Sequence, residues 1–134
     1  MKKVYQIVFV IYLFFVLWYT LLGREESYSV NMLAHPFWEY VNFFKHPDWH
    51  SAHDIVLNIV LFIPFGTLLP LFANKDFKSI AVLALLLSIF IELGQLIFNR
   101  GWCEIDDMFN NTVGACVGFF IYKLVYMITE KRMK

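Results

Sequence analysis

The sequence predicts an all-α integral membrane protein: a four-helix bundle that crosses the bilayer, with a short interfacial helix in the first outer loop. Composition is the first observation, because 60% of the 134 residues are hydrophobic and the mean hydropathy is +0.60, whereas globular domains are roughly 45 to 50% apolar. Length is the second, because four apolar stretches each fall within the roughly 17 to 25 residues that a spanning helix needs. We expect a single membrane domain over residues 1–134, with spans at about 4–22, 55–73, 79–98 and 108–128.

The overall charge points to no charged partner, since 11 basic and 11 acidic residues cancel. The chain has no Lys/Arg-rich block and no RNA-binding motif, so we expect no nucleic-acid partner. No cofactor is expected from the sequence either.

The first span, residues 4–22, contains no charged residue and follows Lys2 and Lys3. A signal peptide is the alternative, but its apolar core would be only about 7 to 15 residues long and would precede a small-residue cleavage site. The residues from Trp18 to Arg24 do not resemble such a site. We therefore expect a retained transmembrane helix.

The connection over residues 23–54 is acidic and aromatic. Pro36 precedes apolar residues at helical spacing, which predicts a short helix lying in the membrane interface. His46, His50 and His53 follow at intervals of four and three residues, but Pro47 interrupts them and no partner motif accompanies them. We expect no metal site there, and we place His53 beside Asp54 at the mouth of a pocket.

The remaining spans carry helix-modifying residues. In the second, Pro64 removes a backbone donor and crowds the preceding turn. The short turn at residues 74–78 makes the second and third spans antiparallel neighbours. In the fourth, Gly114 and Gly118 are four residues apart, a spacing that lets two helices approach closely.

The basic residues predict the orientation of the spans. Placing both termini inside puts seven basic residues in the inner segments and three in the outer ones, which is the arrangement that the positive-inside rule favours. The seven are Lys2, Lys3, Lys75, Lys78, Lys131, Arg132 and Lys134. Eight acidic residues then lie on or near the outer side: Glu25, Glu26, Glu39, Asp48, Asp54, Glu104, Asp106 and Asp107.

Polar residues form stripes near the outer ends of three spans. Residues one or two turns apart lie on one helix face, and polar side chains in a membrane face the bundle interior. We therefore expect the stripes to converge on a ligand-binding pocket that opens outward. Its predicted residues are His53, Asp54, Asn58, Ser88, Glu92, Gln95, Arg100, Asp106, Asp107, Asn110 and Asn111.

Glu92 is the most demanding of these residues, because a carboxylate at membrane depth costs roughly 2.5 to 3.5 kcal/mol. Arg100 is its expected counter-charge, and its planar fork could instead hold a phosphate. Structural interpretations stay open: Glu92 could simply pair with Arg100, and Asp106 and Asp107 could be ordinary acids at a helix N-terminus.

The chain also resembles the VanZ-like family of small bacterial membrane proteins. The resemblance rests on Asn58 with the following Leu61-Phe62-Ile63-Pro64-Phe65-Gly66, on Ser88, Glu92, Gln95 and Arg100, and on Asp106-Asp107, Asn110, Gly114 and Gly118. It implies a multi-pass protein of the bacterial cytoplasmic membrane. It also implies a role of the kind that names the family, reduced susceptibility to the glycopeptide antibiotic teicoplanin.

Three functions are compatible with these features. The leading one is a protein that binds a membrane lipid, a cell-wall lipid precursor or an amphiphilic drug. The alternative is a membrane hydrolase or transferase with Glu92 or Asp107 as general base, or with carboxylates holding Mg²⁺ or Ca²⁺. The third is a structural or partner-docking protein, for example a homo-oligomer assembled through Gly114 and Gly118.

Overall fold

The structure, a computed structural model, describes residues 1–23, 32–33, 36–47, 49–100 and 103–132. Its elements are α1 (Lys2–Leu21), β1 (Met32–Leu33), α2 (Trp38–Lys45), α3 (Trp49–Ala73), α4 (Phe77–Phe98), β2 (Cys103–Glu104) and α5 (Ile105–Arg132). Four of these helices, all but α2, are long and apolar enough to cross a membrane. The prediction of an all-α membrane protein with four spans and one short extra helix is confirmed.

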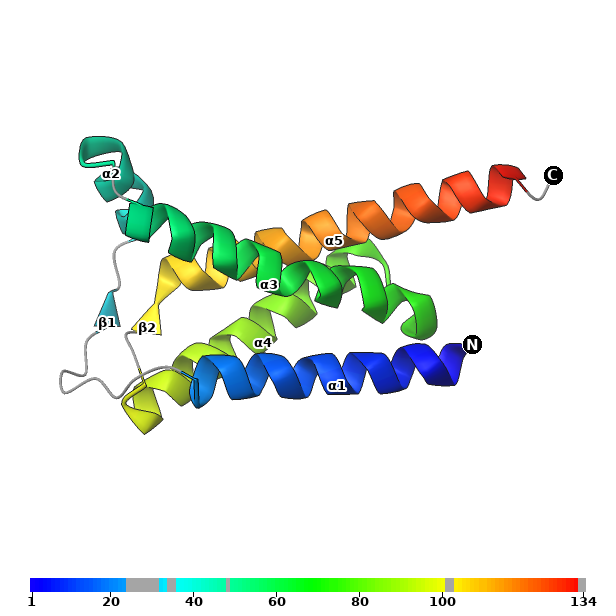
Figure 1. Cartoon of the computed structure of the whole chain (residues 1–134), viewed down its shortest axis with the longest axis horizontal. Coiled ribbons are helices and arrows are strands. Elements are labelled where there is room, and N and C mark those ends of the chain that lie inside the picture. The colour runs from blue at the N-terminus through cyan, green and yellow to red at the C-terminus, as the bar shows by residue number, and fades with distance from the viewer. Residues whose placement is uncertain (24–31, 34–35, 48, 101–102, 133–134) are drawn as a thin grey trace.

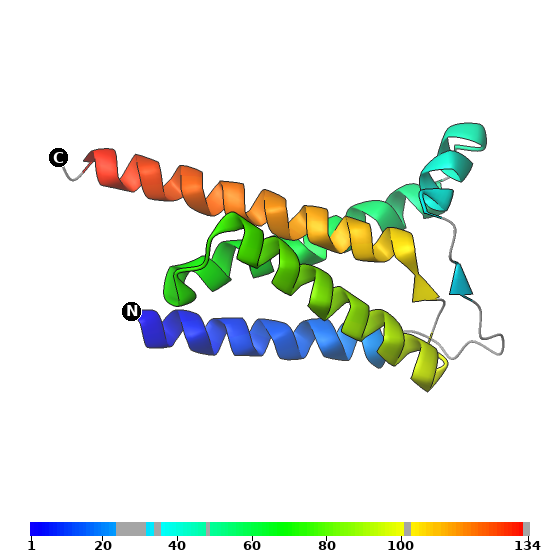
Figure 2. The ribbon, with the colours of Figure 1, turned by 180° about the vertical axis from the view of Figure 1, so that it is seen from behind.

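The two ends of the bundle differ (Figure 1). Helix α2 and the β1–β2 pair lie at one end, here called the α2 end. The start of α1, the turn between α3 and α4 and the last turn of α5 lie at the other, here called the terminal end. Figure 2 shows α4 between α1 and α5, and α3 packs most closely against α5.

All four long helices begin before their predicted spans, and the difference is largest in α3 and α5. Helix α3 begins at Trp49 rather than at residue 55, so His53 and Asp54 are helical. Helix α5 begins at Ile105 rather than at residue 108, and its first turn holds Asp106 and Asp107. Carboxylates are favourable in a first turn because the helix dipole is positive there. These extra turns lie outside the apolar stretches, which is why hydropathy alone does not reveal them.

Helix α2 starts two residues later than the proline suggests. Phe37 is its N-cap and has a left-handed backbone, with φ of 63°, so Pro36 lies outside the helix. The β1–β2 pair was not predicted: its two parallel strands of two residues each pair Met32 with Cys103 and Leu33 with Glu104. It links the segment before α2 to the residues that begin α5.

Glycines bring α3 and α5 into backbone contact. A Cβ on Gly118 would lie 2.1 Å from the carbonyl oxygen of Ile63, and one on Gly66 would lie 1.8 Å from that of Ala115. Gly114 meets Ile59 in the same way, at 2.1 Å. The predicted close approach at Gly114 and Gly118 therefore occurs within this chain, against α3, and a homo-oligomer would need another surface.

The apolar core lies between the four long helices. Its fully buried members include Val16 of α1, Phe62 of α3, Ile80 and Ile91 of α4 and Ala115 of α5. Helix α3 stays helical across Pro64 and Pro70. The Tyr12 hydroxyl donates a hydrogen bond to the Leu61 carbonyl at 2.7 Å. This bond attaches α1 to α3 just before Pro64. The outer faces expose many large apolar residues, as a lipid-facing surface requires.

Candidate functional site

The buried polar residues of the described chain lie towards the α2 end of the bundle. They are Thr20, Asn58, Ser88, Glu92, Gln95, Asp106, Asp107, Asn110 and Asn111. All of them except Thr20 are residues that the sequence singles out for the pocket. The predicted polar stripes of α3, α4 and α5 are therefore buried inside the bundle.

Hydrogen bonds between side chains join the spans in pairs. The Asn58 amide donates to the Asp107 carboxylate and connects α3 to α5. The Asn111 amide donates to the Ser88 hydroxyl at 2.7 Å and connects α5 to α4. Because an unsatisfied polar group inside a bundle is costly, such contacts fix the relative register of the helices.

Gln95 and Glu92 join α4 to other elements. The Gln95 amide donates to the carbonyl of Thr20 at 3.2 Å, and so links α4 to the last turn of α1. The Glu92 carboxylate accepts a hydrogen bond from the backbone N–H of Glu104 at 3.0 Å, and this bond attaches β2 to α4. Arg100 follows α4 and is partly buried. Its backbone N–H donates a hydrogen bond to the Gln95 carbonyl at 2.9 Å. Its role as a counter-charge or phosphate clamp stays a prediction.

Asp106 and Asn110 attach α2 to the bundle. The Asp106 carboxylate accepts the backbone N–H groups of Phe37 and, at 2.8 Å, of Glu39. It thereby caps α2, whose own N-cap residue offers no side-chain acceptor. The Tyr40 hydroxyl donates to the Asn110 side-chain oxygen, and the Asn110 amide donates to Glu39 at 3.4 Å. The first two turns of α5 thus position α2 and its Glu39 over the end of the bundle.

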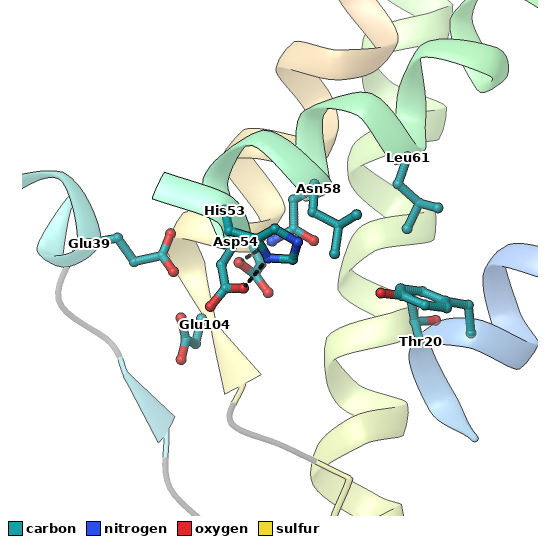
Figure 3. A pocket seen from close by; sticks show the side chains of 10 residues that line it. Thr20, Glu39, His53, Asp54, Asn58, Leu61 and Glu104 are labelled. Atoms are coloured by element: carbon teal, nitrogen blue, oxygen red, sulfur yellow. Dashed lines mark hydrogen bonds and ion pairs between the residues drawn. The ribbon is translucent and has the colours of Figure 1, made fainter. Parts of the chain in front are cut away.

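A pocket of about 320 Å³ opens beside these contacts (Figure 3). Residues from α1, α2, α3, β2 and α5 line it: Tyr19, Thr20, Glu39, His53, Asp54, Leu57, Asn58, Leu61, Glu104 and Asp107. Figure 3 shows Glu39 reaching in from α2, opposite His53 and Asp54 on α3. The His53 Nδ1 atom lies 3.3 Å from the Asp54 carboxylate.

The structure divides the predicted site residues into two groups. The residues that line the pocket are His53, Asp54, Asn58 and Asp107. The remaining ones, which lie in the surrounding polar contacts or next to them, are Ser88, Glu92, Gln95, Arg100, Asp106, Asn110 and Asn111. The pocket is therefore displaced from Glu92 towards α1, α2 and α3.

Two pocket carboxylates, Glu39 and Glu104, are absent from the predicted set. In the sequence they count only as acidic residues of the outer side, because neither lies in an apolar run. Glu39 reaches the pocket through the docking of α2, and Glu104 through β2. An acidic residue in the predicted interfacial helix was the one signal for Glu39.

The pocket is rich in carboxyl groups. The pKa of Glu39 is raised from 4.5 to about 8, mostly by burial and then by the neighbouring acids in the order Asp107, Glu104, Asp106 and Asp54. Burial also raises the pKa of Tyr40, and the charges of Glu39 and Asp106 add to that effect. One carboxylate oxygen from each of Glu39, Glu104 and Asp107 lies within 4.8 Å of the other two. Glu39 therefore holds a proton near neutral pH.

A second, apolar pocket of about 340 Å³ lies on the adjacent face of α3. Its lining residues are Trp49, Ala52, His53, Val56, Leu57 and Val60. His53 and Leu57 line both pockets, so the two are neighbours along one helix. A polar cavity and an apolar groove thus share a boundary at the α2 end.

The fold and site together define a small, multi-pass α-helical membrane protein with a polar pocket at one end of its bundle. The chain belongs to the VanZ/LLP1 family, whose model matches residues 9–126. The VanZ-like resemblance noted from the sequence is confirmed.

One curated relative shows the same relationship. Protein VanZ of Enterococcus faecium is 38% identical to this chain over 79 residues, which cover 55% of this chain and 47% of the relative. The match therefore spans about half the length of that protein. No solved structure matches the chain.

Proposed function

We propose that this protein binds an amphiphile, namely an envelope lipid, a cell-wall lipid precursor or an amphiphilic drug, through the pocket at the α2 end. The observation that carries the proposal is the shared boundary of the polar and apolar pockets at His53 and Leu57. A ligand with a polar head and an apolar chain is the chemistry that fits both. The polar pocket falls in the size range of small-molecule sites, roughly 300 to 1,000 Å³.

The proposal includes the orientation of the protein in the bacterial cytoplasmic membrane, with the α2 end outside and both termini in the cytoplasm. Six of the seven basic residues assigned to the inner side lie at the terminal end of the bundle. They are Lys2, Lys3, Lys75, Lys78, Lys131 and Arg132. Carboxylates gather at the opposite end. This distribution supports the orientation through the positive-inside rule.

The orientation can be tested by labelling single cysteines in intact cells with a membrane-impermeant maleimide. Lys45→Cys in the exposed last turn of α2 should react from outside, whereas Lys75→Cys at the terminal end should react only after the membrane is permeabilised. Both variants carry Cys103→Ser and Cys116→Ser to remove background labelling. The reverse pattern would overturn the orientation.

A role in susceptibility to the glycopeptide antibiotic teicoplanin is part of the proposal. Family membership and the 38% identity to Protein VanZ support it. A lipid precursor or an amphiphilic drug held at the outer surface would be available to such a role.

The phenotype is tested by expressing the chain in a susceptible bacterium and measuring the inhibitory concentration of teicoplanin. Asp54→Asn and Asp107→Asn should each return the cells to the susceptibility of the empty vector. Glu130→Gln removes one carboxylate from an exposed position near the terminal end and serves as the matched control. All three proteins must be equally abundant in the membrane. Undiminished protection by both pocket variants would refute the pocket's part in the role.

A carboxylate-based hydrolase or transferase is the second candidate. It is favoured by the three clustered oxygens of Glu39, Glu104 and Asp107, a hard ligand set suited to Mg²⁺ or Ca²⁺. Of the residues predicted for such chemistry, Asp107 lines the pocket and Glu92 does not. Incubation of the purified protein with phospholipid and polyprenyl-phosphate substrates, with and without a chelator, tests it. Turnover that the chelator stops would favour this candidate.

A further inference from the structure

The pocket's described lining includes four carboxyl groups, those of Glu39, Asp54, Glu104 and Asp107, and no lysine or arginine. We propose that the bound amphiphile has a cationic head, namely a primary ammonium group; this inference rests on the proposed function. The carboxyl groups of Glu39, Glu104 and Asp107 hold the head. The apolar chain lies in the groove beside Val56 and Val60.

The spacing of the carboxylates fits an ammonium nitrogen. Three oxygens no more than 4.8 Å apart share a central point that is at most about 2.8 Å from each, within reach of charge-assisted N–H···O hydrogen bonds from one nitrogen. An ammonium group offers three donors in a compact head, one for each oxygen. Glu39 holds a proton near neutral pH without a bound cation, and an adjacent ammonium charge favours its ionised form. Three acceptors from Glu39, Glu104 and Asp107 then match three donors.

The apolar pocket is an independent observation that points to a chain attached to this head. Its residues face outward from the bundle, with Trp49 86% exposed and Val56 57% exposed. Because it meets the polar pocket at Leu57, a head seated among the carboxylates directs its chain along α3. The groove lies where lipid would surround α3, so burying an alkyl chain there needs no passage through the bundle.

Electrostatics disfavours an anionic head in the same place. A phosphate would add negative charge beside clustered carboxyl groups, whose repulsion is the second cause, after burial, of the raised pKa of Glu39. Arg100, the residue predicted to clamp a phosphate, is not among the described residues that line the pocket. The charge of the pocket thus selects the sign of the head.

The test compares three probes with the same twelve-carbon chain: dodecylamine, dodecyl phosphate and dodecanol. The full chain is reconstituted in phosphatidylcholine nanodiscs at pH 8, and Kd is read from tryptophan fluorescence. Since the probes also partition into lipid, only the part of the signal lost in Leu57→Asn counts as pocket binding. We expect dodecylamine to bind at least tenfold more tightly than dodecyl phosphate.

Variants that remove one carboxyl group from the pocket test how much the charged head contributes to binding. Glu39→Gln and Asp54→Asn should each weaken dodecylamine binding about fivefold or more and leave dodecanol unchanged. Glu130→Gln should bind all three probes as the wild type does. Thermal unfolding of each variant, in the same nanodiscs, establishes that its fold is retained.

The outcomes separate this inference from the proposed function. Tighter binding of dodecyl phosphate or dodecanol than of dodecylamine, lost in Leu57→Asn, would overturn the cationic head and keep the amphiphile pocket. Phosphate binding that requires added Mg²⁺ would overturn it in favour of a metal-bridged head. No Leu57-dependent binding of any probe would overturn both.

Discussion

The Asn58 side-chain amide of α3 donates a hydrogen bond to the carboxylate of Asp107 in the first turn of α5, and both residues are buried. Both also line the polar pocket. The same pair therefore joins the two most closely packed helices and forms part of the candidate site. Stability and binding can be separated there by choosing which half of the pair is changed.

Asn58→Ala should lower the free energy of unfolding by about 1 to 3 kcal/mol, because it removes a donor from a buried carboxylate. Asp107→Asn keeps an acceptor oxygen at the same position, and should cost less while weakening amine binding. Reversible unfolding in mixed micelles measures the first effect. Equal stability of Asn58→Ala and wild type would show that this hydrogen bond does not hold α3 to α5.

Gly118→Ala should destabilise the bundle by about 1 to 3 kcal/mol or more, because the new methyl meets the backbone carbonyl of Ile63, which cannot move aside alone. Gly94→Ala is the matched control. Its methyl would meet the flexible end of the Leu21 side chain at 2.8 Å, so a rotamer change can absorb it. Similar losses in the two variants would contradict backbone packing of α3 on α5.

Asp106→Ala should release the start of α2, since Phe37 and Glu39 lose the acceptor for their backbone N–H groups. The expected cost is about 0.5 to 2 kcal/mol, the range for loss of a helix cap. Hydrogen exchange at residues 37–39 should accelerate while exchange in α4 stays unchanged. Uniform acceleration throughout the chain would indicate global unfolding rather than undocking of α2.

Glu39 should make stability depend on pH. Its pKa in the folded protein is about 8, against an ordinary value of 4.5, so the folded state binds more protons between these values. The Glu39 contribution is therefore most favourable below about pH 4.5 and is lost as the pH rises through 8. Glu39→Gln should remove this dependence.

The measurement compares the Tm of wild type and Glu39→Gln at pH 5.5 and pH 8.5. The variant should gain stability relative to wild type at the higher pH, and titration of other groups cancels in the difference. An identical shift for both proteins would mean that Glu39 is ionised normally in the folded state.

The spans could be read from the sequence because apolar length and charge placement act locally. The polar residues of the spans were equally readable: Asn58, Ser88 and Glu92 stand out because each is costly in an apolar run. The position of the cavity was not, since it depends on how α2 docks on Asp106 and Asn110. Glu39 and Glu104 enter the pocket only through those long-range contacts.

The most direct test of the amphiphile pocket is an experimental structure of the full chain in lipid nanodiscs containing dodecylamine. The bound amine should appear as elongated density with its head among Glu39, Glu104 and Asp107 and its chain along Val56 and Val60 of α3. Asp54→Asn should weaken that density under the same conditions. An unoccupied pocket at a saturating concentration of the amine, in a correctly folded wild-type chain, would contradict it.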